Sequence, residues 1–277
     1  MLASNFDKMT VRDLMTTGLK TCPRDANLAS IASTLVRGNV HAVFVLDESG
    51  RPAGIVSDFD LLAGEWLGSD PEDFATMREI TAAELMTSPL ETIPAESPAA
   101  VAALRMRELH LGRLLVVDGD GSAVGVISVS DLVRPLGELP GGRRYVRDVM
   151  SHAIVTCLVG TSLRSAARAM TERRSRSIVV TDETARAVGI ITGNDMLCLY
   201  QLHDDQQTVA DLMTSPITCS PDLRLRQAAD LMISNEVHRL VVVDQQQSRG
   251  APLGIISTSD VVAEMASARS EWQQDSA

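Results

Sequence analysis

The chain repeats a short pattern four times along its 277 residues. The pattern is glycine, two aliphatic residues, Ser or Thr, two variable residues and Asp, and its glycines follow one another at intervals of 71, 64 and 65 residues. The four copies are Gly54–Asp60, Gly125–Asp131, Gly189–Asp195 and Gly254–Asp260. A long internal period of this kind indicates one supersecondary unit used several times. The chain is therefore predicted to contain four equivalent units.

Two further landmarks keep the same order in every copy. An acidic residue, an aliphatic residue and Met come before the motif, at Asp13–Met15, Glu84–Met86, Asp148–Met150 and Asp211–Met213. Between this landmark and the motif lies an apolar run that ends in an aspartate, at Asp47, Asp118, Asp182 and Asp244. Three landmarks in one order in four copies exclude a chance similarity.

Each copy shows the pattern of a β-α-β-β-α unit. Thr10, Thr81 and Thr208 stand three residues before an acidic residue, which is the spacing of a capping box, whereas the third copy has Tyr145 there and must be capped differently. A short extended piece follows, and then an amphipathic helix; in the fourth copy Leu225, Ala228, Ala229 and Met232 fall at helical spacing. Two β-rich runs, 240–243 and 253–256, flank a polar turn and predict a hairpin before the final helix. The fold class is therefore α/β.

Composition narrows the function classes. The formal charge is −11 and aromatic residues make up 3% of the chain, which disfavours nucleic acid as a partner because phosphate backbones are repelled and stacking platforms are scarce. The chain has no apolar run near the roughly 20 residues of a membrane span and no recognisable signal segment, so we expect a soluble, cytoplasmic protein without membrane contact. Its four cysteines lack metal-binding or disulfide spacing, and those that follow a threonine in the repeat are expected to be buried, reduced thiols.

These motifs resemble the cystathionine-β-synthase (CBS) domain family, and the resemblance covers about residues 8–265. It implies that the repeats pair through their sheets, around an approximate two-fold axis, into two modules. We expect the modules at 8–136 (repeats of about 8–65 and 80–136) and at 143–265 (repeats of about 143–202 and 206–265). The turn-forming linker Pro135–Gly142 would separate them, and the connector 63–80 accounts for the longer first interval.

The motif itself allows two interpretations. In the first, its Ser or Thr caps the following helix, and its Asp favours the positive end of that helix. In the second, which the resemblance implies, Asp binds the ribose hydroxyls of a nucleotide and Ser or Thr contacts ribose or phosphate. The ribose-binding candidates are Asp60, Asp131, Asp195 and Asp260, and the ribose- or phosphate-binding candidates are Ser57, Ser128, Thr192 and Ser257.

Cations recur in register at the start of the first hairpin strand. In each copy, at least one of two adjacent residues at this place is His or Arg. By resemblance to four-repeat family members such as the AMP-activated protein kinase gamma subunits, these two positions would contact phosphate. The candidates are His41, Arg113, Arg176, His238 and Arg239. The resemblance further places a base pocket at Thr16, Thr87, Thr214, Val40, Leu111 and Val237, where the third copy has Ser151 and Ser175 instead.

The sequence favours a regulatory protein over an enzyme. It contains no recognisable catalytic motif, and the methionines are better explained as core or interface residues than as a metal site. The expected ligand is an adenosine nucleotide (AMP, ADP or ATP). We expect no required cofactor and no metal site. We also expect a protein partner, which the sequence does not identify, and the formation of a homodimer is left open. Three alternatives remain: an interaction scaffold without nucleotide, a sensor of an S-adenosylmethionine type of ligand, and a ligand-gated nucleic-acid binder.

Overall fold

The computed structural model describes residues 8–66, 80–135, 144–197, 207–244 and 250–266. The first repeat contains β2 (Thr21–Pro23), α3 (Leu28–Gly38), β3 (Ala42–Leu46), β4 (Pro52–Ser57) and α4 (Asp58–Trp66). β2 pairs with β3 in parallel, and β3 pairs with β4 as an antiparallel hairpin. The predicted β-α-β-β-α order and hairpin are confirmed.

The other three repeats have the same order. The second consists of β5 (Thr92–Pro94), α7 (Ala99–Glu108), β6 (Arg113–Val117), β7 (Ala123–Ser128) and α8 (Val129–Val133). The third consists of β8 (Thr156–Leu158), α9 (Leu163–Glu172), β9 (Ser177–Thr181), β10 (Ala187–Thr192) and α10 (Gly193–Met196). The fourth consists of β11 (Thr218–Cys219), α11 (Leu225–Ser234), β12 (Arg239–Val243), β13 (Pro252–Ser257) and α12 (Thr258–Met265).

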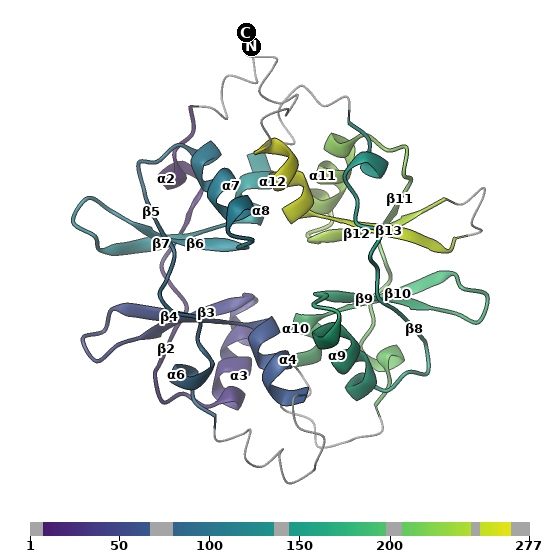
Figure 1. Ribbon diagram of the computed structural model, residues 1–277, viewed down its shortest axis with the longest axis horizontal. Helices are drawn as coiled ribbons and strands as arrows, with labels where there is room; N and C mark the ends of the chain where they lie inside the picture. The colour runs from purple at the N-terminus through teal and green to yellow at the C-terminus, as the bar shows by residue number, and fades with distance from the viewer. Residues whose placement is uncertain (1–7, 67–79, 136–143, 198–206, 245–249, 267–277) are drawn as a thin grey trace. The chain divides into compact units, whose positions relative to one another are not determined.

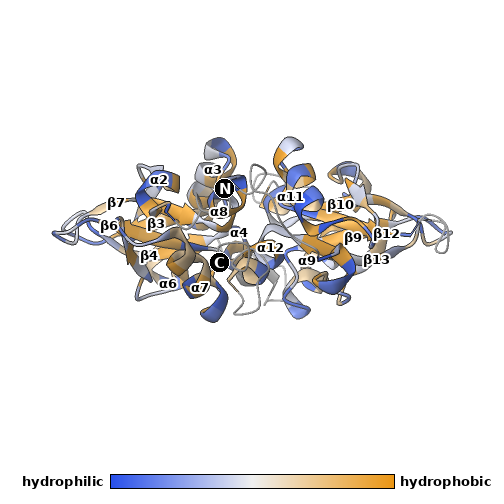
Figure 2. Ribbon diagram, turned by 90° about the horizontal axis from the view of Figure 1, so that it is seen from above, coloured by the Kyte–Doolittle hydropathy of each residue, from blue (hydrophilic) through white to orange (hydrophobic). Residues whose placement is uncertain are grey.

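Helical periodicity explains how each first helix packs. The apolar stripe predicted for the fourth repeat is buried along α11, and α9 buries Leu163, Ala166, Ala167 and Met170 at the same spacing. The central strands are almost wholly apolar because both of their faces are covered, and Figure 2 shows apolar residues concentrated in strands such as β3 and β9. Cys22 and Cys219 are buried in these cores, as predicted, whereas Cys157 is half-buried.

A short lead-in helix opens each repeat: α2 (Val11–Leu14), α6 (Ala82–Leu85), and the 3₁₀ turns η2 (Val146–Asp148) and η4 (Val209–Asp211). Capping boxes at Thr10, Thr81 and Thr208 start three of them, as predicted. In the third repeat the amide of Tyr145 donates to Asp148, and the Tyr145 ring lies 4.6 Å from the guanidinium carbon of Arg147 and 4.1 Å from that of Arg224. Cation–π contacts thus stabilise the different start of this repeat.

Each lead-in segment joins the sheet of a neighbouring repeat and not its own. β1 (Thr16–Thr17), from the first repeat, pairs with β7 of the second, and Thr87, from the second, pairs with Ile55 in β4 of the first. The third and fourth repeats make the same exchange, through the pairs Ser151–Ile255 and Thr214–Ile190. The exchange is therefore reciprocal within repeats 1 and 2 and within repeats 3 and 4.

The chain divides into two compact units. Unit 1 comprises 1–18, 91–153 and 217–277, and unit 2 comprises 19–90 and 154–216. In unit 1 the helices α7, α8, α11 and α12 pack together beside the sheets of repeats 2 and 4; in unit 2, α3, α4, α9 and α10 do the same for repeats 1 and 3 (Figure 1). The division into modules 8–136 and 143–265 remains a prediction, and most of its linker, 136–142, lies outside the described residues, as does 67–79 of the connector.

Candidate functional site

The hydroxyl and the carboxylate of the motif are hydrogen-bonded in every repeat. The Oδ2 atom of Asp accepts from the backbone amide of the Ser or Thr three residues earlier at 2.7 or 2.8 Å, and from its hydroxyl at 2.6 Å. The pairs are Ser57–Asp60, Ser128–Asp131, Thr192–Asp195 and Ser257–Asp260. The capping interpretation predicts these hydrogen bonds, but they involve only one oxygen of each carboxylate. Since an ionised carboxylate accepts several hydrogen bonds, capping and ribose binding are compatible.

The predicted cations lie beside this motif. In the second repeat Arg113 stands directly across the hairpin from Ser128, and in the fourth Arg239 stands across from Ser257. The first repeat has Ala42 at this place, preceded by His41, whose carbonyl oxygen accepts from the amide of Asp58 at 3.1 Å. Arg176 and His238 make the same backbone bond in their repeats, to Gly193 and Thr258. All four repeats thus carry His or Arg at the start of the motif helix.

The structure assembles each predicted base-pocket threonine with the motif of a neighbouring repeat. Thr87 and Ile55 exchange backbone hydrogen bonds of 2.9 and 3.1 Å, and Ile55 lies two residues before Ser57. Residues two apart on a strand share a face, so Thr87 lies beside the side of β4 that carries the motif serine. In the same register, Thr16 pairs with Val126, Ser151 with Ile255 and Thr214 with Ile190. Each site therefore combines two repeats.

The remaining base-pocket candidates lie at the ends of the first helices. Val40 packs against the core of unit 2, while Leu111 and Val237 pack against the core of unit 1. Ser175, at the equivalent place in the third repeat, donates its hydroxyl to the carbonyl of Ser177 at 2.7 Å. The third repeat thus has a hydrogen-bonded hydroxyl where the other repeats have an apolar side chain.

Two sequence landmarks, the glycine of the motif and the methionine of the lead-in segment, meet in space. A Cβ atom on Gly54 would lie 2.3 Å from Sδ of Met86, and one on Gly189 would lie 2.4 Å from Sδ of Met213. At Gly125 the nearest atom is the carbonyl oxygen of Thr16, at 2.5 Å. The glycine is required because the exchanged segment of the neighbouring repeat lies against the backbone at this point.

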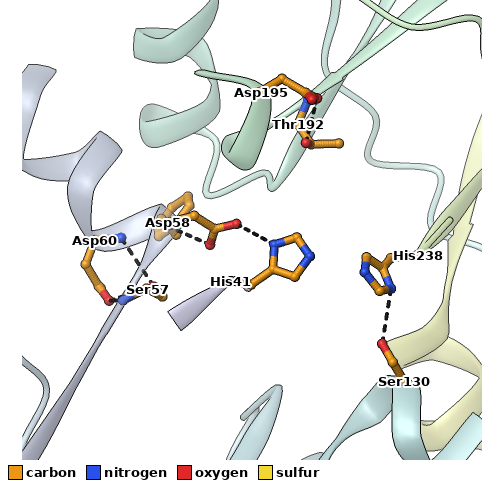
Figure 3. Close-up of polar contacts among 9 residues, drawn as sticks. His41, Ser57, Asp58, Asp60, Ser130, Thr192, Asp195 and His238 are labelled. Atoms are coloured by element: carbon orange, nitrogen blue, oxygen red, sulfur yellow. Dashed lines mark hydrogen bonds and ion pairs between the residues drawn. The ribbon is translucent and has the colours of Figure 1, made fainter. Parts of the chain in front are cut away.

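The two histidines predicted to contact phosphate, His41 and His238, have different partners (Figure 3). Nδ1 of His41 lies 3.0 Å from Oδ2 of Asp58, the residue that follows the motif serine in the same repeat. Oδ1 of Asp58 accepts from the amide of Phe59 at 2.8 Å. Nδ1 of His238 lies 3.1 Å from the hydroxyl of Ser130, a motif residue of the second repeat. One histidine thus contacts a carboxylate, and the other contacts a hydroxyl.

Burial affects the charge of one motif carboxylate. Desolvation raises the pKa of Asp260, whereas the bonds from Ser257 and the charge of Arg239 act in the opposite direction. Further hydrogen-bond donors to this carboxylate would offset part of its desolvation.

The described residues form neither a metal site nor a membrane span. No group of three or more His, Cys, Asp or Glu side chains in the described ranges is placed to hold a metal ion. No helix within the described part of the chain is both long and apolar enough to span a membrane.

Four α/β repeats that exchange lead-in segments, each with a Ser/Thr–Asp motif beside a His or Arg, define a class of paired-repeat α/β protein. The model of the CBS domain family matches residues 11–65, 82–138, 146–201 and 209–267. The chain belongs to the CBS domain family.

The chain is also similar to individual proteins. The chain is 27% identical over 212 residues to protein MJ1404 of Methanocaldococcus jannaschii, a match that covers 71% of this chain and 48% of that protein. It is 33% identical over 128 residues to the arabinose 5-phosphate isomerase KdsD of Pseudomonas aeruginosa, covering 46% of this chain and 37% of the isomerase. The chain thus spans about half or less of the length of these relatives.

A solved structure has the same fold over nearly the whole chain. It is protein MJ1225 of Methanocaldococcus jannaschii, described as a candidate archaeal homologue of g-AMPK. The TM-score is 0.80 at 19% identity, and the match covers 92% of this chain and 99% of that one. This likeness confirms the four-repeat fold.

Sequence reasoning missed Asp58 and Ser130, which contact the predicted phosphate-binding histidines. The signal was present in the repeat itself. The position after the motif hydroxyl is Asp58 in the first copy and Val129, Gly193 and Thr258 in the others, so only the first carries a charge there.

Proposed function

We propose that the protein is a regulatory CBS-domain protein that binds adenosine nucleotides and signals their occupancy to a protein partner. Each site would take the ribose on a motif Asp, the phosphate on the adjacent His or Arg and the helix start, and the base beside the exchanged Thr or Ser. The observation that carries the proposal is that three groups predicted separately from the sequence meet at one strand end in each of the four repeats. They are the Ser/Thr–Asp motif, the exchanged Thr or Ser, and a His or Arg that lies across from the motif hydroxyl or one residue before that position.

The chemistry of these groups suits a nucleotide. A carboxylate can accept from two neighbouring ribose hydroxyls, and Arg239 or Arg113 can donate charge-assisted hydrogen bonds to a phosphate. His238 supports the same role because its contact with Ser130 joins the phosphate position of the fourth repeat to the motif of the second. Occupancy could then alter how repeats 2 and 4 pack, provided that the ligand binds the two arrangements with different affinity.

An interaction scaffold is the second candidate, and one observation favours it. All four motif carboxylates already cap helices, so a purely structural role would account for their recurrence. Under this hypothesis no nucleotide would stabilise the protein.

Thermal unfolding of the full chain with AMP, ADP, ATP and S-adenosylmethionine distinguishes the candidates. A nucleotide at 100 times its dissociation constant should stabilise the protein by about 2.7 kcal/mol, and mass spectrometry of ligand released from the purified protein should identify an adenosine compound. Absence of stabilisation by all four compounds would favour the scaffold. Stabilisation by S-adenosylmethionine alone would identify the other ligand class, and salt-sensitive binding of oligonucleotides would favour the nucleic-acid alternative.

A double substitution tests the proposed contact of His238 and Arg239 with phosphate. Replacing His238 and Arg239 together by Ala should weaken ATP binding about tenfold or more and leave adenosine binding nearly unchanged, because charge-assisted hydrogen bonds to phosphate are lost. Equal weakening of both ligands would show that the pair is structural.

A further inference from the structure

The first repeat differs from the others in the charge beside its motif. Asp58 lies directly after the motif serine, where the other repeats have Val129, Gly193 and Thr258. Its side chain is only 12% exposed, and it accepts from the amide of Phe59 at the start of α4. A carboxylate is therefore built into the place where the helix start would meet the phosphate of a ligand.

The same carboxylate holds the histidine of the first repeat. Oδ2 of Asp58 lies 3.0 Å from Nδ1 of His41, the residue that the sequence assigns to phosphate. A carboxylate can only accept, so this contact places the proton of a neutral imidazole on Nδ1 and leaves Nε2 as an acceptor. Two donors suited to a phosphate, the Phe59 amide and the His41 N–H, are thus directed to Asp58.

The cation that the second and fourth repeats supply is absent from the equivalent strand position of the first repeat, as it is from that of the third, which has Ser177. Arg113 and Arg239 stand across from the motif serine in the second and fourth repeats, whereas Ala42 stands there in the first. With the His41 imidazole neutral, the formal charges at the motif Asp, at the residue after its hydroxyl and at this strand position sum to −2 in the first repeat, −1 in the third and 0 in the second and fourth. An incoming phosphate would therefore meet the strongest repulsion in the first repeat.

We infer that Asp58 is a specificity-determining residue, which makes the site of Ser57, Asp60 and Thr87 select an adenosine ligand whose ribose carries an uncharged or positively charged group in place of phosphate. The inference rests on the proposed function, since it assigns a ligand class to one of the proposed sites. Ribose and base contacts remain, because Ser57 and Asp60 keep the geometry of the other repeats. Only the phosphate subsite is occupied by the protein's own anion.

The test compares adenosine with AMP, which differ only in the phosphate group. Calorimetric titrations use the full chain carrying Asp131→Asn, Asp195→Asn and Asp260→Asn, so that the site of the first repeat is the one left with its motif carboxylate. Adenosine should bind at least about tenfold more tightly than AMP. Adding Asp58→Asn, which keeps the shape of the side chain, should strengthen AMP binding about tenfold and leave adenosine binding unchanged.

A matched control places a carboxylate at the same position of the fourth repeat. In a chain that retains only Asp260 among the motif carboxylates, Thr258→Asp should weaken AMP binding about tenfold relative to Thr258→Asn, with adenosine affected equally by both changes. Thermal unfolding of each variant verifies its folding. Should Thr258→Asp fail to fold, the Asp58→Asn result decides.

The outcomes separate the inference from the proposed function. If the unmodified chain binds neither adenosine nor AMP, both are wrong. If the unmodified chain binds AMP but the site of the first repeat binds AMP as tightly as adenosine, binds neither, or loses AMP affinity on Asp58→Asn, the proposed function stands and the inference is overturned. The last result would show that Asp58 charges His41 to hold a phosphate.

Discussion

Two carboxylates, those of Asp13 and Asp260, accept the same capping hydrogen bonds but have pKa values shifted in opposite directions. Asp13 and Asp260 each accept from the amide and hydroxyl of a residue three positions earlier. The bonds from Thr10 lower the pKa of Asp13, whereas burial raises the pKa of Asp260 above that of an ordinary carboxyl group. The two residues should therefore respond to pH in opposite directions.

The first prediction follows from these signs. A raised pKa in the folded state means that Asp260 contributes most stability below the pKa of the unfolded chain, and that this contribution is lost as pH rises through the folded pKa. Asp260→Asn should therefore become more stable relative to the unmodified chain between pH 4 and pH 7. Asp13→Asn should become less stable relative to the unmodified chain as the pH rises toward 4, since a pKa lowered from 3.8 adds stability that is complete above that value and is lost at lower pH. Urea unfolding at several pH values measures both differences, and trends of the same sign would contradict the assignment.

Residue-level prediction from the sequence succeeded where one residue type recurs and failed where a contact is unique. The capping partners could be predicted because hydroxyl and carboxylate lie three residues apart in every copy. The contact between His41 and Asp58 could not, since the two are 17 residues apart and only the fold of the hairpin brings them together.

At the scale of elements, the exchanged lead-in segments depend on a glycine in each neighbouring strand. Met86 and Met213 lie where a Cβ atom on Gly54 and Gly189 would be. The motif glycine and the lead-in methionine thus recur together in the sequence because they pack against each other in the structure.

A second prediction uses this contact. Gly54→Ala should destabilise the protein by about 1–3 kcal/mol through overpacking against Met86, and Met86→Ala in the same chain should recover part of that loss. Gly125→Ala should not be relieved by Met15→Ala, because its nearest neighbour is the backbone oxygen of Thr16. Gly119→Ala is the control, since nothing lies within 4 Å of its added Cβ, and it should change stability by about 0.5 kcal/mol or less. Additive effects of Gly54→Ala and Met86→Ala in a double-mutant cycle would show that the two do not interact.

The order of the elements was predictable, but the exchange of segments was not. Periodicity identified α11 and the β12–β13 hairpin because their core contacts lie within the repeat. The pairing of Thr16 with Val126 and of Thr87 with Ile55 joins different repeats. A local pattern carries no information on which copy of an identical strand receives the segment.

At the scale of the whole molecule, two kinds of contact bind the repeats in different combinations. The segment exchange joins repeat 1 with 2 and repeat 3 with 4, whereas helix packing joins repeat 2 with 4 in unit 1 and repeat 1 with 3 in unit 2. Leu62 of the first repeat, for example, is fully buried in the core of the third. Each repeat can make both contacts because the segment exchange involves its strands and the packing involves its helices.

A third prediction tests whether the two repeats joined by segment exchange fold without the other two. A chain cut within 136–142 keeps both exchanges intact, so each half should retain native-like circular dichroism as the module assignment predicts. Each half also exposes helix faces, such as that of α8 against α12, and the two should recombine into a one-to-one complex measurable by light scattering. Two halves that are unfolded alone, while the full chain is folded, would contradict the assignment to modules.

The central claim is that the four motif carboxylates bind ribose as well as cap helices. Calorimetric titration of AMP into the full chain and into a variant with Asp60, Asp131, Asp195 and Asp260 all changed to Asn tests it most directly. Asn still offers a capping oxygen, so the variant should retain its fold by circular dichroism while AMP binding falls at least about a hundredfold, because charge-assisted bonds to the ribose hydroxyls are lost. A folded variant that binds AMP as tightly as the unmodified chain would contradict the claim, as would an unmodified chain that binds no adenosine nucleotide.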